Sequence, residues 1–353
     1  MMRKYLPTII PERPGYPFTA HLLSALYPYE FTYPWIHSNF IQMAYTENHL
    51  YPARGHATFP LDMQYTWQDY HLHQYCPFIE NVKVHKDMIN YKYKSFQEFI
   101  EYCISENWFI LTSLNNRYIP FSENYQKTDL SHYTFITGID TELRTARIAD
   151  FYNFLRYKQY DCPLEELELA YKDSKGYVFD PIEEQITKFI QCYRVTEAVP
   201  RYRFDINLIK MKLKDFLSSK DSFGKILECN DFADSDYWVG LSVYDKMIEY
   251  AREEGRGHFQ SFAYLVEHKI LQKNRIAYLH QQGYLENHQY QELKPYMEEL
   301  LFLADHCLKN SIKALVHYQK NMSMKNEFGK IAVLLREIRN NDCTLTEKLL
   351  SYL

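Results

Sequence analysis

The chain has 353 residues, 40 of them lysine or arginine and 45 aspartate or glutamate, so its formal charge is −5. A hydrophobic content of 46% excludes an intrinsically disordered chain, the acidic balance disfavours a general nucleic-acid binder, and no apolar run approaches the ~18 residues of a membrane span. Seven cysteines without a Cys-x-x-Cys pair predict neither a disulfide framework nor a zinc knuckle, and with no secretory segment expected they favour a cytoplasmic protein.

Up to residue 160 the apolar runs are short and aromatic residues are dense, which predicts a mixed α+β domain over residues 1–160. Ser95 followed by Glu98 resembles a capping box, and the apolar stripe behind it predicts a helix. Runs rich in β-branched and aromatic residues predict strands. The expected elements are a helix over 96–104 and strands at 82–84, 108–114, 132–137 and 146–151, the last two forming a hairpin.

After Cys162-Pro163, apolar residues recur at helical spacing, which predicts an all-helical domain over residues 161–353. At roughly 150 residues per domain, a chain of this length fits two domains. The helical segments expected are 164–170, 186–190, 208–216, 243–250, 259–285 and 293–318.

Cofactor and metal chemistry have little support in the sequence. There is no GxGxxG or GxxxxGK[ST] motif, and ten glycines leave little room for a phosphate-binding loop. His71 and His73 alternate as metal ligands on a strand would, but no HExxH motif or carboxylate cluster accompanies them. We therefore expect no cofactor and no metal.

The clearest chemical signal lies in the expected hairpin. His132 begins one strand and Asp150 ends its partner, so closing the turn at Gly138-Ile139-Asp140 brings the two side chains together. An aspartate hydrogen-bonded to an imidazole fixes the tautomer of the ring and supports the imidazolium during acyl transfer. Such a pair across a hairpin also occurs as a purely structural contact.

The pattern of His132, Gly138-Ile139-Asp140 and Ile148-Ala149-Asp150 resembles the second half of papain-like cysteine peptidase folds. The arrangement is more closely similar to the butirosin biosynthesis protein H-like family, associated with nonribosomal peptide synthetase clusters. Four further segments of the sequence resemble this family. Pro34–Gln42 resembles the family's first helix, and Leu164–Leu167 resembles the helix that follows the aspartate strand. Two segments resemble the family's helical half: Tyr237–Gly240 and Phe262–Lys269. The resemblance implies a papain-like N-terminal domain, a helical C-terminal domain and transfer of an aminoacyl group from a carrier protein to an amine.

The sequence departs from this family at the nucleophile. The resemblance places a cysteine at the start of the first helix, where the helix dipole lowers its pKa, but no cysteine precedes Cys76. On the expected first helix, Ser38 points away from the face formed by Ile36, Phe40, Met43 and Ala44. The candidate catalytic set is therefore Ser38 as nucleophile, His132 as general base and acid, and Asp150 to orient His132.

Two classes of function remain open from the sequence. One is an acyltransferase or hydrolase acting on carrier-bound aminoacyl or peptidyl thioesters, with an acyl or peptidyl carrier protein and a small-molecule amine acceptor as partners. The other is a catalytically inactive peptidase-like protein that binds a carrier protein or peptide. The sequence names neither the acyl donor nor the acceptor, gives no oligomeric state, and leaves the 33 tyrosines without a role.

Overall fold

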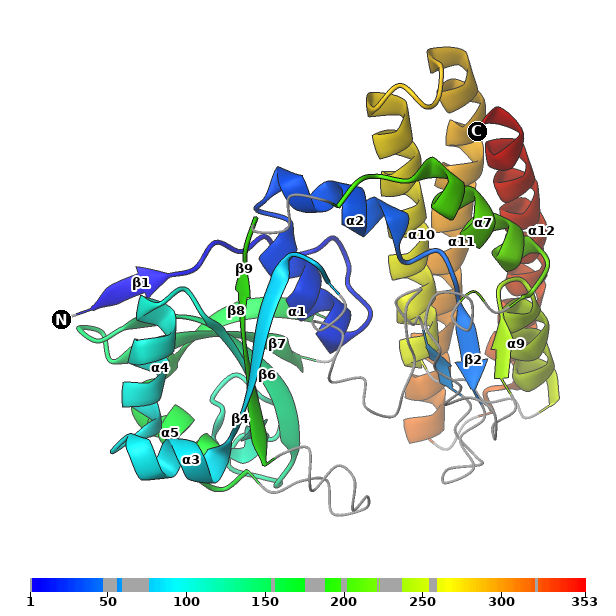
Figure 1. Cartoon of the computed structure of the whole chain (residues 1–353). Coiled ribbons are helices and arrows are strands. Elements are labelled where there is room, and N and C mark those ends of the chain that lie inside the picture. Colours follow the sequence, from blue (N-terminus) through cyan, green and yellow to red (C-terminus); the bar gives the residue numbers. More distant parts are fainter. Residues whose placement is uncertain are drawn as a thin grey trace. The chain divides into compact units, whose positions relative to one another are not determined.

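The structure is a computed structural model, and it describes residues 2–46, 56–58, 76–153, 156–174, 188–197, 202–220, 222, 237–253, 259–320 and 323–353 (Figure 1). The chain divides into two compact units, each made of separate stretches. The first unit comprises Met1–Pro11, Pro17–Thr32 and His73–Arg201, and the second comprises Glu12–Tyr16, Tyr33–Leu72 and Tyr202–Leu353.

The first unit is built on an antiparallel sheet. Within the described residues this sheet has seven strands in the order β4-β9-β5-β6-β7-β8, with β1 pairing beside β6. Every residue of β5 is buried, as expected for a central strand in an apolar run. The strands are β1 (Arg3–Tyr5), β4 (Ile79–His85), β5 (Phe109–Asn115), β6 (Ser131–Asp140), β7 (Thr145–Asn153), β8 (Arg156–Pro163) and β9 (Phe189–Val195).

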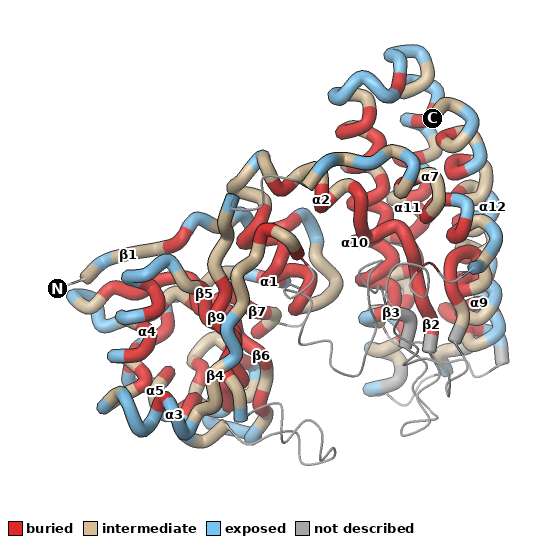
Figure 2. Tube along the Cα trace, in the orientation of Figure 1, coloured by how far each residue is buried: buried red, intermediate tan, exposed pale blue. Residues whose placement is uncertain are grey.

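The helices of this unit pack on the sheet: α1 (Pro17–Leu26), α3 (Lys86–Lys92), α4 (Phe96–Ser105) and α5 (Leu164–Lys172). The Ser95 cap that predicted α4 is present, because the Ser95 hydroxyl accepts from the Glu98 backbone N–H. The Glu98 carboxylate accepts from the backbone N–H of Lys94 instead of that of Ser95, so the reciprocal bond of a capping box is shifted by one residue. Figure 2 shows α1 buried, and all its residues from Phe18 to Leu26 lack substantial exposure. A helix buried on all sides shows no amphipathic stripe, which is why the sequence pattern did not predict α1.

The sheet extends further along the chain than expected. The prediction of a helix over 186–190 is wrong, because Phe189 begins the strand β9. Ile186, at the start of that prediction, lies outside the described residues. β9 lies between β4 and β5 and pairs with both, so the chain up to Val195 completes this sheet. The expected domain boundary at residue 160 falls inside β8, whereas the compact units divide after Arg201.

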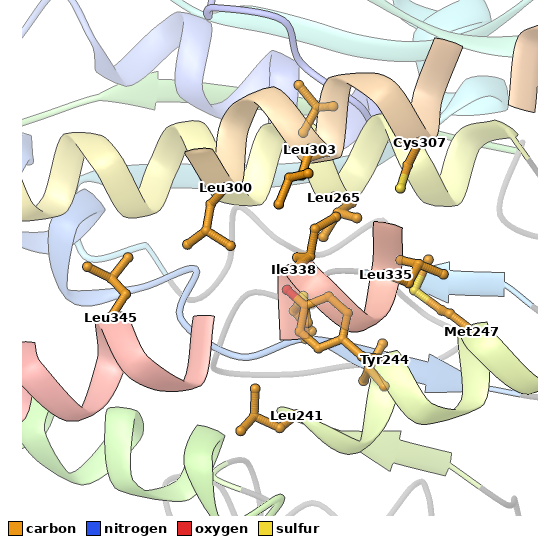
Figure 3. Packing of buried hydrophobic residues seen from close by; sticks show 14 of the residues in the cluster. Leu241, Tyr244, Met247, Leu265, Leu300, Leu303, Cys307, Leu335, Ile338 and Leu345 are labelled. Carbon is orange, nitrogen blue, oxygen red and sulfur yellow. The ribbon is translucent and has the colours of Figure 1, made fainter. Parts of the chain in front are cut away.

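The second unit is mainly helical. Its long helix α11 packs against both α10 and α12, and α9 packs against α12 (Figure 1). Their shared core includes Leu265, Leu303 and Leu335 (Figure 3). The elements are α2 (Tyr33–Ser38), α7 (Ile206–Leu217), α9 (Ser242–Glu253), α10 (Phe259–Gln281), α11 (Asn287–Gln319) and α12 (Lys325–Tyr352), with a small antiparallel sheet of β2 (Ala44–Thr46), β3 (His56–Thr58) and β10 (Tyr237–Val239).

The architecture is thus α+β, with an antiparallel sheet followed by a helical C-terminal region. No helix in the described ranges combines the length and the apolar character needed to cross a membrane.

Candidate active site

The His132 and Asp150 side chains lie on the same face of the sheet. In β6 and β7, Phe135 is in register with Ala149 and Ile136 with Ile148, which brings Thr134 opposite Asp150. Successive side chains of a strand point to opposite faces, so His132, Thr134 and Ile136 share one face with Asp150. The hairpin expected from the sequence is therefore confirmed, but the expected turn at Gly138-Ile139-Asp140 is wrong, because these residues end β6 and pair with Arg147, Ala146 and Thr145.

The two side chains are joined by a short hydrogen bond. His132 Nδ1 lies 2.6 Å from Asp150 Oδ2. The carboxyl group is buried, with 1% of its side chain exposed, whereas the imidazole keeps 30% exposure. No other side chain in the described parts of the chain hydrogen-bonds to the ring. With Nδ1–H donating to Asp150, the lone pair of Nε2 is the basic position of the imidazole.

Opposing effects act on the pKa of His132. Burial lowers it, whereas the charge of Asp150, the hydrogen bond to that carboxylate and a backbone hydrogen bond at Tyr133 raise it. The net direction is upward, because the protonated ring lies directly against a buried carboxylate. A histidine held in this way can accept a proton and stabilise the resulting imidazolium, which is the behaviour of a general base.

Two further residues of the hairpin take part in the site, and the sequence analysis missed both. Thr134 Oγ1 lies 3.3 Å from Asp150 Oδ2 and 2.6 Å from the Tyr152 hydroxyl. The other carboxyl oxygen of Asp150 accepts from the backbone N–H of Phe151 at 2.7 Å. The sequence did contain a signal for these two residues. Polar residues at 132 and 134 and at 150 and 152 are spaced two apart, which places them on the same face of their strands.

Helix α1 lies on the opposite face of the sheet. Its Phe18 and His21 rings pack against Tyr133 and Phe135, at centroid distances of 5.4 and 5.3 Å. Tyr133 and Phe135 alternate with His132 and Thr134 along β6, so they point to the other face. On the face of the His132–Asp150 pair, Tyr160 instead contacts the ring of Tyr152 and stacks on Phe121.

Ser38, the third residue of the expected catalytic set, belongs to the second unit. It is the last residue of α2, and its hydroxyl donates to the Pro34 carbonyl at 2.7 Å. The residue has no exposed surface, and its own carbonyl accepts from Lys212 Nζ at 2.8 Å. The hydroxyl thus makes the bond to the carbonyl one turn earlier that serines commonly make inside helices.

The helix carrying Ser38 is also shorter than expected. The family resemblance implied a helix over 34–42, but α2 ends at Ser38 and Phe40 adopts a positive φ of 61°. The Asn39 side chain donates to the Trp35 carbonyl at 2.7 Å, which satisfies one of the carbonyls left open at the helix end. The prediction that Phe40, Met43 and Ala44 extend one helical face is therefore wrong, and Ala44 begins β2.

His71 and His73, considered as metal ligands, lie outside the described residues. Within the described ranges no group of three or more His, Cys, Asp or Glu side chains is arranged to hold a metal ion.

The chain matches no protein-family model and no curated protein sequence at a significant level.

Proposed function

We propose that this protein is an acyltransferase or hydrolase that acts on carrier-protein-bound aminoacyl or peptidyl thioesters. The observation that supports it is the 2.6 Å contact between His132 Nδ1 and a buried Asp150 carboxylate, with the imidazole partly exposed. The substrate class comes from the sequence resemblance to the butirosin biosynthesis protein H-like family. The same resemblance leads us to propose a papain-like fold for the first unit.

In the proposed reaction, His132 Nε2 removes a proton from the attacking group as that group bonds to the thioester carbonyl carbon. The tetrahedral intermediate then collapses, the carbon–sulfur bond breaks, and the imidazolium returns its proton to the leaving sulfur. Asp150 keeps the ring in one tautomer and stabilises its charged form. Neither residue is consumed, and the acyl group moves to water or to an amine.

The attacking group can be Ser38 or the acceptor itself. Ser38 would have to give up its bond to the Pro34 carbonyl and emerge from a fully buried position. An acceptor amine or a water molecule needs no such rearrangement, so we favour direct attack assisted by His132.

Turnover of aminoacyl N-acetylcysteamine thioesters by the full chain tests this proposal, with and without added amine. We expect His132→Gln to reduce turnover by about 10²- to 10⁴-fold, and Ser38→Ala to retain it. The matched control is His85→Gln, which removes a histidine of the same unit that pairs with Asp87 at 3.4 Å. Equal turnover in His132→Gln and His85→Gln would exclude general-base catalysis by His132.

A second candidate is a catalytically inactive peptidase-like protein that binds a carrier protein or peptide. It is favoured by the buried Ser38 hydroxyl, which already donates to a backbone carbonyl. Calorimetric titration with a carrier protein separates the two candidates. Binding of the carrier protein, together with thioester turnover that is equally low in the wild type and in His132→Gln, supports the inactive protein.

A further inference from the structure

The hydrogen bonds around Asp150 have a determined direction. An ionised carboxylate only accepts, so the single hydroxyl hydrogen of Thr134 points to Asp150 Oδ2. The Thr134 oxygen must then accept, which makes the Tyr152 hydroxyl the donor of the 2.6 Å bond between them. Tyr152 is suited to donate, because burial and the charge of Asp150 raise its pKa well above the usual value and keep it protonated.

We propose that Thr134 and Tyr152 form a hydroxyl relay that positions Asp150 and reduces the proton affinity of the His132–Asp150 pair. All three side chains beyond His132 are buried, at 0% exposure for Thr134 and Asp150 and 3% for Tyr152. Hydrogen bonds in such surroundings polarise one another, so donation by Tyr152 strengthens donation by Thr134. The relay's catalytic consequence rests on the proposed function, whereas its effect on titration does not.

The sign follows from the charge of the pair. With His132 neutral, the pair carries one negative charge, and with His132 protonated it carries none. A donor aimed at Asp150 stabilises the negatively charged state more, because the attraction of a hydroxyl dipole grows with the charge it faces. The relay therefore favours loss of the proton, which keeps more of His132 in the form that can act as a base.

Several other ionisable groups approach the relay. On β8, Lys158 is in register with Asp150 and is exposed. The ring centroids of Tyr160 and Tyr152 lie 5.7 Å apart. Cys162 stays neutral because burial, with the charge of Glu166 on α5, raises its pKa to about 12. The charge of Asp150 also contributes to the raised pKa of Tyr157. On β5, the register partners of His132 and Thr134 are the uncharged Leu114 and Thr112.

Thr112 offers a matched control for Thr134. The two threonines are direct cross-strand partners on β5 and β6, and both are fully buried. Thr112 Oγ1 has no hydrogen-bond partner among the described residues. Replacing either threonine by valine removes one hydroxyl at nearly constant volume, but only Thr134→Val removes a donor to Asp150.

The experiment is an NMR pH titration of the His132 imidazole in the full chain, with the signal assigned by its loss in His132→Gln. We expect Thr134→Val to raise the titration midpoint by about 0.5 pH unit or more, and Tyr152→Phe to raise it by less. Thr134→Ser, which keeps the hydroxyl, should return the midpoint to that of the wild type, and Thr112→Val should leave it unchanged. Equal midpoints in Thr134→Val and Thr112→Val, or a lower midpoint in Thr134→Val, would overturn the relay.

If Thr134→Val does not fold, Tyr152→Phe decides alone, and an unchanged His132 midpoint overturns the relay. The pH dependence of thioester turnover in the same variants links the relay to catalysis, because the inflection should move with the NMR midpoint. If the proposed function is wrong, thioester turnover will be the same in the wild type and in His132→Gln. The effect of the relay on the titration midpoint of His132 does not depend on that outcome.

Discussion

Lys269 Nζ lies 2.6 Å from Asp342 Oδ2, and neither side chain has any exposed surface. This ion pair joins α10 to α12 within the second unit. The Tyr244 hydroxyl donates to the same Asp342 oxygen at 2.8 Å, and Gln272 donates to the other at 2.7 Å. Burial raises the pKa of Asp342, but the charges of Lys269 and His268 and the hydrogen bonds from Lys269 and Gln272 together lower it by more, so the net direction is downward. The second unit therefore holds a paired and fully hydrogen-bonded carboxylate inside an apolar helical core.

Removal of one member of this ion pair should be costly. We expect Asp342→Asn to lower the free energy of unfolding by about 3–5 kcal/mol, because Lys269 stays buried without a counter-charge. The double variant Lys269→Met, Asp342→Leu should lose clearly less, since no charge is then left in the core. Urea denaturation of both variants measures the difference. Equal losses in the two would contradict the view that an uncompensated charge causes the instability.

We expect the buried carboxyl group of Glu267 to make the free energy of unfolding fall as pH rises. Its Oε2 accepts from the Gly15 backbone N–H at 2.9 Å, and its Oε1 has no hydrogen-bond partner among the described residues. Burial raises the pKa of Glu267 to about 8, against the lowering effect of the Gly15 and Tyr16 backbone. Because the folded pKa exceeds the unfolded value of about 4.3, the stabilisation is fully present below that value and is lost as pH rises to about 8.

The measurement is the free energy of unfolding at pH 5, 6, 7 and 8 for the wild type and Glu267→Gln. Over this range Glu267 should contribute a decline of up to about 1.4 kcal/mol per pH unit, which the glutamine variant lacks. The difference between the two curves isolates Glu267 from the other titrating groups. Parallel curves would show that this carboxyl ionises as freely in the folded chain as in the unfolded one.

Two glycines of the second unit should respond to alanine in opposite directions. Gly240 has a φ of +60°, and a Cβ there would lie 2.3 Å from the Phe216 carbonyl oxygen, so we expect Gly240→Ala to destabilise by about 2–4 kcal/mol. Gly329 lies inside α12 with nothing within 4 Å of an added Cβ, so Gly329→Ala should stabilise by about 1 kcal/mol. Thermal unfolding of both variants checks the pair. Destabilisation by Gly329→Ala would mean that α12 is not helical at this position.

The upward shift in the pKa of His132 predicts how Asp150→Asn behaves with pH. Only the neutral imidazole acts as a base, so thioester turnover should fall as pH drops through the raised pKa, and in Asp150→Asn the inflection should move to lower pH.

Because the folded pKa of His132 exceeds the unfolded value of about 6.5, its ion pair with Asp150 stabilises the fold below that value, and this stabilisation is lost as pH rises through the folded pKa. Asp150→Asn should therefore cost more stability at pH 5.5 than at pH 9, as measured by denaturant unfolding. A cost independent of pH would argue against a protonated His132 beside Asp150.

Much of the first unit follows from local sequence signals. The Ser95 cap and the apolar stripe behind it defined α4, and the β-branched and aromatic runs defined β5, β6 and β7, because these signals act within a few residues. The side-by-side placement of His132 and Asp150 was equally predictable, since a tight hairpin fixes the register of its two strands. Thr134 and Tyr152 obey the same period of two.

β9 and Ser38 needed the tertiary structure. The apolar residues at 186–190 fit a helical spacing, but Phe189–Val195 is a strand because it fills the position between β4 and β5, over 70 residues away in the sequence. Ser38 was grouped with His132 through the family resemblance, whereas the structure shows its backbone carbonyl accepting a hydrogen bond from Lys212, 174 residues further along. The sequence by itself thus determined α4, the strands β5, β6 and β7, and the His132–Asp150 pair. Contacts between residues far apart in the chain decided the unit to which each segment belongs. Buried backbone N–H and C=O groups must be hydrogen-bonded, and tertiary packing determines which residue supplies the partner.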